Sequence, residues 1–412
     1  MRILFLPAYY LPEKAASSYL GDNIREALCK DGNYIELYTP TPSRGVSKEE
    51  RAKYCTKPYR TEVLYDGRMT IHRFSLYAEG KNPMARAFRY LLCWIKQFNR
   101  GLLAKDIECI YLASTPPIQG LLGAFLKKLK KKPFVYNLQD IFPDSLVGAG
   151  LAKKDGLLWK IGRLIENFTY KNADKIIVIS QDFKRNIMAK GVPEEKIEVI
   201  YNWVDAEAVR PVAKDGNPLF EEFGLSRETF TVVYAGNLGY AQNIDIILDA
   251  AARLPEVQFA LFGTGGREAE IRERIVAEQL GNVHLNPLQP YGRVSQVYGL
   301  GDVCVVSCKP GLGGAAMPSK TWSIMSSGSA VLASFDDGEL KDIIEKGPYG
   351  VFTHAGNVQE FVSAIRSLAA DRERCWEMGH NARRFIENNL TKEVGTGKYV
   401  ETIRSVVKKQ TC

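Results

Sequence analysis

Short, continuous apolar runs recur along the chain and alternate with stretches of helical periodicity. In the first half these runs lie at 2–6, 34–39, 109–114, 134–138, 175–180 and 198–202. Runs this short and this uniformly hydrophobic are typical of strands buried on both faces of a parallel sheet. Between them, apolar residues return at helical spacing, as at Ile118, Leu121, Leu122, Phe125, Leu126 and Leu129. The alternation predicts a doubly wound α/β architecture.

The alternation stops at 206–228, where Pro, Gly, Asp and Asn occur without a sustained period. We interpret this segment as a linker between domains. Strand-like runs then resume at 230–236, 257–263, 283–288, 302–307, 330–334 and 349–352, and helical patterns fill 357–370, 373–388 and 393–409. The chain is therefore predicted to form two Rossmann-like lobes with a cleft between them, lined by the loops that follow the strands.

Composition narrows the class of protein without naming it. The 412 residues are 45% hydrophobic and 25% charged, enough to bury two cores, and the net charge of +8 comes without a nucleic-acid recognition motif. Eight scattered cysteines and four scattered histidines show no metal-ligand spacing and favour a reducing cytoplasm. No apolar run is long enough to span a bilayer. We read the start, MRILFLPAYYL, as a buried strand and not a signal peptide.

Glycine-rich turns follow two strands of the second half, at Gly236-Asn237-Leu238-Gly239 and at Gly263-Thr264-Gly265. Glycine lets a backbone approach a phosphate closely, and a following helix offers its N-terminus to an anion. The alternative is an ordinary strand-to-helix turn. Neither the GxGxxG fingerprint of dinucleotide-binding proteins nor the Walker A motif of NTPases occurs, which disfavours both classes.

A third candidate is the small-residue loop from Lys309 to Lys320. Pro318 is expected at the first turn of a helix, with Ser319 and Lys320 beside it, where free amides and the helix dipole favour an anion. The alternative is a surface loop with a solvated lysine.

Two acidic residues of the first half could act on an acceptor. Asp140 directly follows a predicted strand and could take a proton from an acceptor hydroxyl, or else cap the next helix. Glu13 lies in the small-residue loop 11–18 and could contact the acceptor or the sugar; the alternative is a plain connection with a serine cap.

Seven motifs together resemble a known family: PEKAAS at 12–17, NLQDIFPDS at 137–145, IIVIS at 176–180, VIYNWVD at 199–205, VYAGNLGYAQN at 233–243, FGTG at 262–265 and MPSKTWSIMSSG at 317–328. The set resembles family 4 of the retaining GT-B glycosyltransferases. Within it, the chain is similar to the bacterial surface-polysaccharide branch of N-acetyl-L-fucosamine and colanic acid transferases.

The resemblance implies an acceptor-binding lobe at 1–205, a nucleotide-sugar-binding lobe at 206–389, and a C-terminal helix at about 390–412 that crosses back to the first lobe. It implies retaining transfer from a nucleotide sugar, with UDP expected over GDP, and no metal or other cofactor. The acceptor is expected to be a lipid-linked saccharide of capsule, O-antigen or exopolysaccharide synthesis.

The same resemblance assigns site residues. Asp140 and Glu13 are expected to be catalytic, and Ala15, Ala16 and Ser17 to lie on the acceptor side. The donor is expected to contact Gly236, Asn237, Leu238, Gly239, Gln242, Gly263, Thr264, Gly265, Pro318, Ser319, Lys320 and Glu339.

The chain departs from the family pattern at charged positions. Asn237 stands for the usual Arg, Gln242 for the usual Lys, and Ala315 and Ser323 for the paired Glu residues. With two cations missing, Lys320 and backbone amides must offset the diphosphate charge. We expect Glu339 to stand in for a lost acid near the ribose or the sugar.

Two basic segments suggest an anionic membrane surface as a partner. Residues 81–105 hold six basic residues, no acid and several apolar ones, and 127–132 add a lysine cluster. The alternative is a helix packed on the core with a solvated basic face. We expect a peripheral location on the inner face of the cytoplasmic membrane.

Two other functions remain open from the sequence. A sugar-nucleotide epimerase of the same two-lobed shape would need cleft acids and histidines, and only four histidines exist. A non-catalytic binding protein would explain the missing pair of glutamates.

Overall fold

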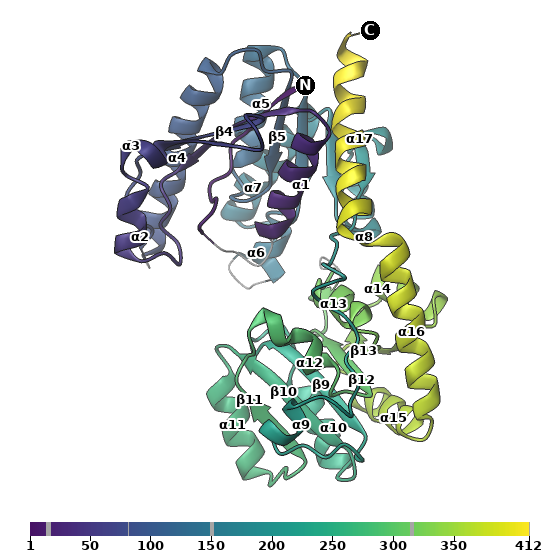
Figure 1. The fold of residues 1–412 in the computed structure, drawn as a ribbon. Helices are drawn as coiled ribbons and strands as arrows, with labels where there is room; N and C mark the ends of the chain where they lie inside the picture. Colours follow the sequence, from purple (N-terminus) through teal and green to yellow (C-terminus); the bar gives the residue numbers. More distant parts are fainter. Residues whose placement is uncertain (14–17, 81, 149–151, 314–316, 412) are drawn as a thin grey trace. The chain divides into compact units, whose positions relative to one another are not determined.

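A computed structural model describes residues 1–13, 18–80, 82–148, 152–313 and 317–411. The chain divides into two compact units (Figure 1). Unit 1 comprises Met1–Tyr201 together with Glu393–Cys412, and unit 2 comprises Asn202–Lys392. The boundary thus falls a few residues before the position at 205 and 206 that the sequence suggested.

Unit 1 is built on an eight-stranded sheet with the order β3-β4-β2-β1-β5-β6-β7-β8. Its strands are β1 (Arg2–Phe5), β2 (Tyr34–Pro40), β3 (Thr61–Leu64), β4 (Met69–Phe74), β5 (Cys109–Ala113), β6 (Phe134–Leu138), β7 (Lys175–Val178) and β8 (Ile197–Val199). Its helices are α1 (Ser18–Lys30), α2 (Lys48–Lys53), α3 (Lys57–Arg60), α4 (Pro83–Leu103), α5 (Gln119–Lys130), α6 (Asp144–Gly148), α7 (Leu157–Asn172), α8 (Gln181–Ala189) and α17 (Lys392–Thr411).

Alternate side chains of the central strands of unit 1 face two helical layers, because successive residues of a strand point to opposite faces. Ile110 and Leu112 of β5 pack with Leu122 and Leu126 of α5 in one core. On the other face, Tyr111 of β5 packs edge-on against Tyr399 of α17.

Two strands of unit 1 were not expected from the sequence. The ends of β3 and β4 are joined by a turn whose residues Tyr65, Asp66 and Gly67 all have positive φ, and β3 pairs antiparallel to β4 at the edge of the sheet. In β4 only alternate residues such as Met69 and Ile71 are fully buried. A search for continuous apolar runs therefore passes over this hairpin, whose period is that of a half-exposed strand.

Unit 2 is a six-stranded parallel sheet with the order β11-β10-β9-β12-β13-β14. The strands are β9 (Thr231–Asn237), β10 (Gln258–Thr264), β11 (Val283–Asn286), β12 (Val303–Ser307), β13 (Ala330–Phe335) and β14 (Gly350–His354). The helices are α9 (Leu219–Glu222), α10 (Asp245–Arg253), α11 (Glu268–Ala277), α12 (Val294–Tyr298), α13 (Lys320–Ser326), α14 (Glu339–Lys346), α15 (Val358–Ala369) and α16 (Arg372–Asn389).

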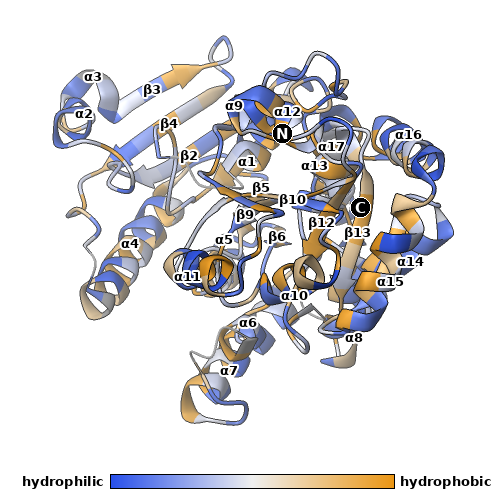
Figure 2. Ribbon diagram, turned by 90° about the horizontal axis from the view of Figure 1, so that it is seen from below, coloured by the Kyte–Doolittle hydropathy of each residue, from blue (hydrophilic) through white to orange (hydrophobic). Residues whose placement is uncertain are grey.

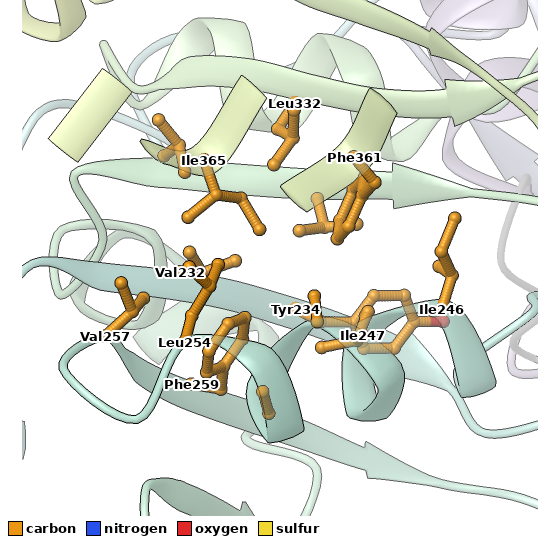
Figure 3. Close-up of a cluster of buried hydrophobic side chains, with 14 of the residues drawn as sticks. Val232, Tyr234, Ile246, Ile247, Leu254, Val257, Phe259, Leu332, Phe361 and Ile365 are labelled. Carbon is orange, nitrogen blue, oxygen red and sulfur yellow. The ribbon is translucent and has the colours of Figure 1, made fainter. Parts of the chain in front are cut away.

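The core of unit 2 lies between its strands and the helices α10 and α15. Val232 and Phe259 from the strands meet Ile247 of α10 and Phe361 of α15, and the ring of Tyr234 lies beside Ile247 (Figure 3). This core holds the ends of β9 and β10 in place, where the glycine-rich turns begin.

The segment 206–228 is not a free linker, contrary to the expectation from its composition. It belongs to unit 2, where Val209, Leu219 and Phe220 are completely buried. Its prolines and glycines stop regular structure without stopping burial, and composition reports only the first of these properties.

Candidate functional site

The two glycine-rich turns of unit 2 lie side by side because β9 and β10 are paired over their full lengths, with Gly236 opposite Gly263. A Cβ added at Gly263 would come within 2.4 Å of the Gly236 carbonyl oxygen, so only glycine fits there. The amide of Leu238 donates to the Thr264 carbonyl at 2.9 Å. The backbone amide of Leu238 is therefore already bonded within the protein. It is not available to a phosphate of the donor, whereas the sequence had suggested a contact there.

Lys320 reaches the same place from α13. Its ammonium nitrogen lies 4.0 Å from the centroid of the Tyr234 ring. A Cβ on Gly236, whose φ is +147°, would lie 2.9 Å from this nitrogen. Gly236 therefore leaves the space that the ammonium occupies.

The ammonium of Lys320 is buried, and within the described part of the chain it has no hydrogen-bond partner. Burial lowers the pKa of Lys320 to about 7. A buried cation without an acceptor is costly, and an anion delivered by a ligand would relieve this cost. The Lys320 ammonium is therefore a candidate contact for an anion.

Tyr234 is the residue of this site that sequence reasoning missed. Its ring supports the Lys320 ammonium, and its hydroxyl donates to the Asn237 carbonyl at 2.7 Å. The signal was present in the sequence, since Tyr234 precedes Gly236 by two positions and the side chains at i and i+2 share one face of a strand.

The last residue of β9 and the loop after it carry the two positions where the family cations are missing. The side-chain amide nitrogen of Asn237 lies 3.4 Å from the Gln242 side-chain oxygen. A Cβ on Gly239 would lie 2.7 Å from both of these side-chain atoms, so glycine leaves the room that their contact needs. The hydroxyl of Ser307 donates to the Gln242 backbone carbonyl at 2.6 Å. The hydroxyl of Thr264, across from Asn237, donates to Glu268.

The helix start predicted at Pro318 differs in the structure. Helix α13 begins at Lys320, with Ser319 as its N-cap residue and no side-chain capping bond, so Pro318 precedes the helix. The Lys320 ammonium is therefore the candidate anion contact that the structure describes at this helix start.

The remaining donor-side positions are placed in part. Asp336 holds the loop before α13, because its carboxylate accepts from the amides of Gly311 and Gly313. Glu339 is the first residue of α14 and is 4% exposed. Ser323 lies within α13, and Ala315 is outside the described residues. A contact between Glu339 and the donor stays a prediction.

In unit 1, the carboxylate of Glu13 is buried and holds two loops together. One oxygen accepts from the amides of Ser43 and Arg44 at 2.7 and 2.8 Å, and the other lies 3.4 Å from the Tyr10 amide. These bonds give Glu13 a role in positioning the loop after β1, and its catalytic role stays a prediction. Ala15, Ala16 and Ser17 lie outside the described residues.

Asp140 follows β6 and precedes α6. Partial burial raises its pKa, and hydrogen bonds with the Ser145 side chain and the Ile141 backbone oppose the rise. A carboxylate with a raised pKa is a stronger base. The bond to Ser145 also matches the capping alternative, and the catalytic role stays a prediction.

A cavity of about 190 Å³ opens at the carboxyl ends of β1, β5 and β6 in unit 1. Gln139, the neighbour of Asp140, lines it. So do Asp22 and Arg25 of α1, which form a 2.6 Å ion pair, while the Arg25 guanidinium stacks on Tyr10. Sequence reasoning missed this pair, because nothing local distinguishes its charges from those on a solvated helix face.

Within the described ranges, His, Cys, Asp and Glu side chains form no group of three that could hold a metal ion.

Two family models match the chain in sequence order. The model described as Glycosyltransferase Family 4 matches residues 22–208, and the model described as Glycosyl transferases group 1 matches residues 217–385. Among curated proteins, the chain is 28% identical to the putative colanic acid biosynthesis glycosyl transferase WcaI of Escherichia coli, over 98% of this chain and 100% of that protein. These matches do not favour the epimerase or the non-catalytic alternative.

Solved structures with the same fold include sucrose-phosphate synthase of Thermosynechococcus elongatus, with a TM-score of 0.78 and 16% identity over 99% of both chains. Anabaena HepE in complex with UDP-glucose matches with a TM-score of 0.70 and 18% identity, over 98% of this chain and 100% of that one. The expected GT-B fold of two Rossmann-like lobes is thereby confirmed. With a family 4 domain in its first half and a group 1 domain in its second, the chain belongs to the family 4 glycosyltransferases.

Proposed function

We propose that unit 2 binds a UDP-sugar and that the sugar is transferred, with its anomeric configuration retained, to a saccharide bound by unit 1. The single observation that carries the donor site is the Lys320 ammonium, which is buried beside two glycine turns and finds no acceptor among the described residues. UDP-glucose in the HepE complex supports the choice of donor.

The proposed reaction needs no metal. The acceptor hydroxyl oxygen forms a bond to the anomeric carbon while the bond from that carbon to the diphosphate oxygen breaks. The proton of the hydroxyl passes to the leaving diphosphate. Lys320 would offset the charge that develops on this group, which is the role of a preorganised cation.

For the acceptor we propose a lipid-linked saccharide of bacterial surface-polysaccharide synthesis, a proposal that the similarity to WcaI supports. The cavity in unit 1 offers a mainly apolar wall with the Asp22–Arg25 pair at one side, which suits a sugar ring and its hydroxyls. A lipid carrier would place the enzyme at the inner face of the cytoplasmic membrane.

The test is a Lys320→Met variant with UDP binding measured by calorimetry. Loss of one charge-assisted hydrogen bond, worth about 1.5–3 kcal/mol, predicts binding weakened by about 10- to 100-fold. The melting temperature without ligand should stay equal or rise, because the variant removes an unpaired buried charge. A variant that melts earlier and binds UDP as the wild type does would give Lys320 a structural role instead.

A further inference from the structure

Helix α4 buries polar side chains and exposes apolar ones, unlike an ordinary amphipathic helix. The face that packs on unit 1 contains Arg89 and Gln97, both completely buried. Their side chains are held inside by bonds from Arg89 to the Tyr77 carbonyl and from Gln97 to the Pro7 carbonyl. The opposite face exposes Phe88 and Leu91 to 57% and 49%. Helix α4 thus packs on unit 1 through Arg89, Cys93 and Gln97 and carries exposed apolar side chains on its other face.

The apolar face of α4 continues over two further helices. Trp94 of α4 meets Phe125 of α5 at 6.2 Å between ring centroids, and Phe125 meets Phe168 of α7 at 5.5 Å. These rings make the three helices neighbours, and α4 and α7 each carry hydrophobic residues among hydrophilic ones (Figure 2). We call the exposed apolar side chains of these helices the three-helix surface: Met84, Phe88, Leu91, Ile95, Leu102, Leu103, Phe125, Leu129, Leu157, Leu158, Ile161 and Leu164.

Helix α7 contributes strongly exposed side chains to this surface, although it lies outside the two basic segments noted in the sequence. Leu157 and Leu164 are 78% and 70% exposed. Large apolar side chains gathered on one face at this exposure are typical of a binding surface.

The charged residues of the three helices indicate which partner the three-helix surface binds. Helices α4, α5 and α7 carry ten basic residues and one acid. That acid, Glu166, is buried and paired with Lys190 and Arg163. Within α4, α5 and α7, therefore, no acid is exposed. A second copy docked by a two-fold axis would bring two cationic surfaces together, which disfavours self-association.

We propose that unit 1 inserts the three-helix surface into the headgroup region of an anionic lipid bilayer, with α7 as well as α4 in contact. None of the described helices combines the length and apolar character needed to cross a bilayer. Electrostatic attraction of the lysine cluster 127–132 is not a sufficient basis for binding, because two of its lysines are already engaged. Lys130 donates to the Leu102 and Ala104 carbonyls, and Lys127 pairs with Asp174. The ammonium of Lys128 lies over the ring of Phe168, beside the apolar residues. From there it would reach lipid phosphates when these residues insert.

The experiment measures co-sedimentation of the full chain with vesicles of phosphatidylcholine and phosphatidylglycerol at a ratio of about 3:1. The test variant is Leu91→Ser/Leu157→Ser/Leu164→Ser. Its matched control, Val63→Ser/Leu64→Ser/Val276→Ser, removes three exposed apolar residues outside the surface. We expect the test variant to lose at least about tenfold in vesicle partitioning, at low and at high salt, because apolar burial is not screened. The control should partition as the wild type does.

Three results would overturn the inference. One is equal partitioning of the wild type and the test variant. Another is equal binding of the wild type to vesicles of phosphatidylcholine alone. The third is a wild-type dimer in sedimentation analysis that the test variant abolishes together with vesicle binding. The inference deepens the membrane location proposed above. UDP binding, measured on the same samples, should be unchanged in the test variant, so failure of the donor assignment and failure of the surface assignment are separate results.

Discussion

Lys320 is the residue whose environment separates a functional role from a structural one. A structural lysine at a protein surface keeps its ammonium in water or pairs it with a carboxylate. Here the ammonium is buried over the Tyr234 ring without an acceptor among the described residues. Folding tolerates this cost at a place where a ligand can supply the missing negative charge.

The pH dependence of donor binding follows from this environment. Burial lowers the pKa of Lys320 from 10.5 to about 7, and a bound diphosphate favours the charged form and raises it again. Binding above pH 7 therefore takes up a proton. UDP-sugar affinity should fall as the pH rises from about 7 to 8.5, approaching tenfold per pH unit. Calorimetry in two buffers of different ionisation enthalpy measures the proton uptake.

Lys320→Met is the control for this dependence and should show none over the same range. The stability of the fold depends on pH in the opposite direction to donor affinity. The reason is that Lys320 holds its proton up to pH 10.5 in the unfolded chain and only up to about 7 in the folded chain. Lys320 therefore makes the free energy of unfolding increase as the pH rises between these two values. A wild-type affinity that does not change with pH would contradict the assignment.

Gly236→Ala tests the space beside that ammonium. The substitution forces a side chain onto a backbone with φ of +147° and places a Cβ 2.9 Å from the Lys320 nitrogen. We expect a loss of about 1–3 kcal/mol in the free energy of unfolding, together with weaker UDP binding. Urea unfolding and calorimetry measure the two effects. Gly216→Ala, where a Cβ would meet no atom within 4 Å, should change neither.

At the scale of elements, one arginine joins three parts of unit 2. The Arg383 guanidinium of α16 donates to the Ala206 and Val209 carbonyls and to the Ser326 carbonyl of α13, at 2.8 to 3.0 Å. These bonds explain why the segment after Tyr201 packs within unit 2 despite its loop-like composition. The segment is ordered by partners that are distant in sequence.

Arg383→Ala should therefore destabilise unit 2 by about 2–3 kcal/mol, because the Ala206 and Ser326 carbonyls lose the donor that Arg383 supplies. Arg384→Ala is the neighbouring control, since Arg384 is exposed and donates only to Asn381 among the interactions that the structure resolves for it. Thermal unfolding monitored in unit 2 measures the difference. Equal destabilisation by both substitutions would show that helix propensity, and not the bonds of Arg383, decides the effect.

At the scale of the whole molecule, the last helix belongs to the first unit. Tyr399 and Ile403 of α17 are buried there, and the Tyr399 hydroxyl donates to the Asn137 side chain of β6 at 3.1 Å. On the exposed side, Arg404 pairs with Asp31 after α1. Unit 1 is thus completed by residues that are distant in sequence from its sheet.

Tyr399→Ala should destabilise unit 1 by about 3–5 kcal/mol, through the cavity it leaves and the lost hydrogen bond. Hydrogen exchange distinguishes the units: amides of β5 and β6 should exchange faster, and those of β9 and β10 should not change. Lys398→Ala, an exposed neighbour on the same helix, is the control. Faster exchange in both units would mean that they unfold as one.

The sequence alone was sufficient for the two-lobed architecture and for the glycine turns. Every continuous apolar run that we read as a strand is one, because a strand buried on both faces needs apolar residues at consecutive positions. The turns at Gly236 and Gly263 were equally visible, since a backbone that approaches another backbone closely requires glycine.

Only the tertiary structure decided what individual charges do. Glu13 holds two loops, Arg89 is buried, and Lys320 lies over the Tyr234 ring with no acceptor in the described ranges. Each outcome depends on residues from distant segments that the sheets bring together. Periodicity is a property of neighbours in the chain, whereas the partner of a charge is a property of the fold. For this reason the sequence predicted the glycine turns but not the surroundings of the charged side chains.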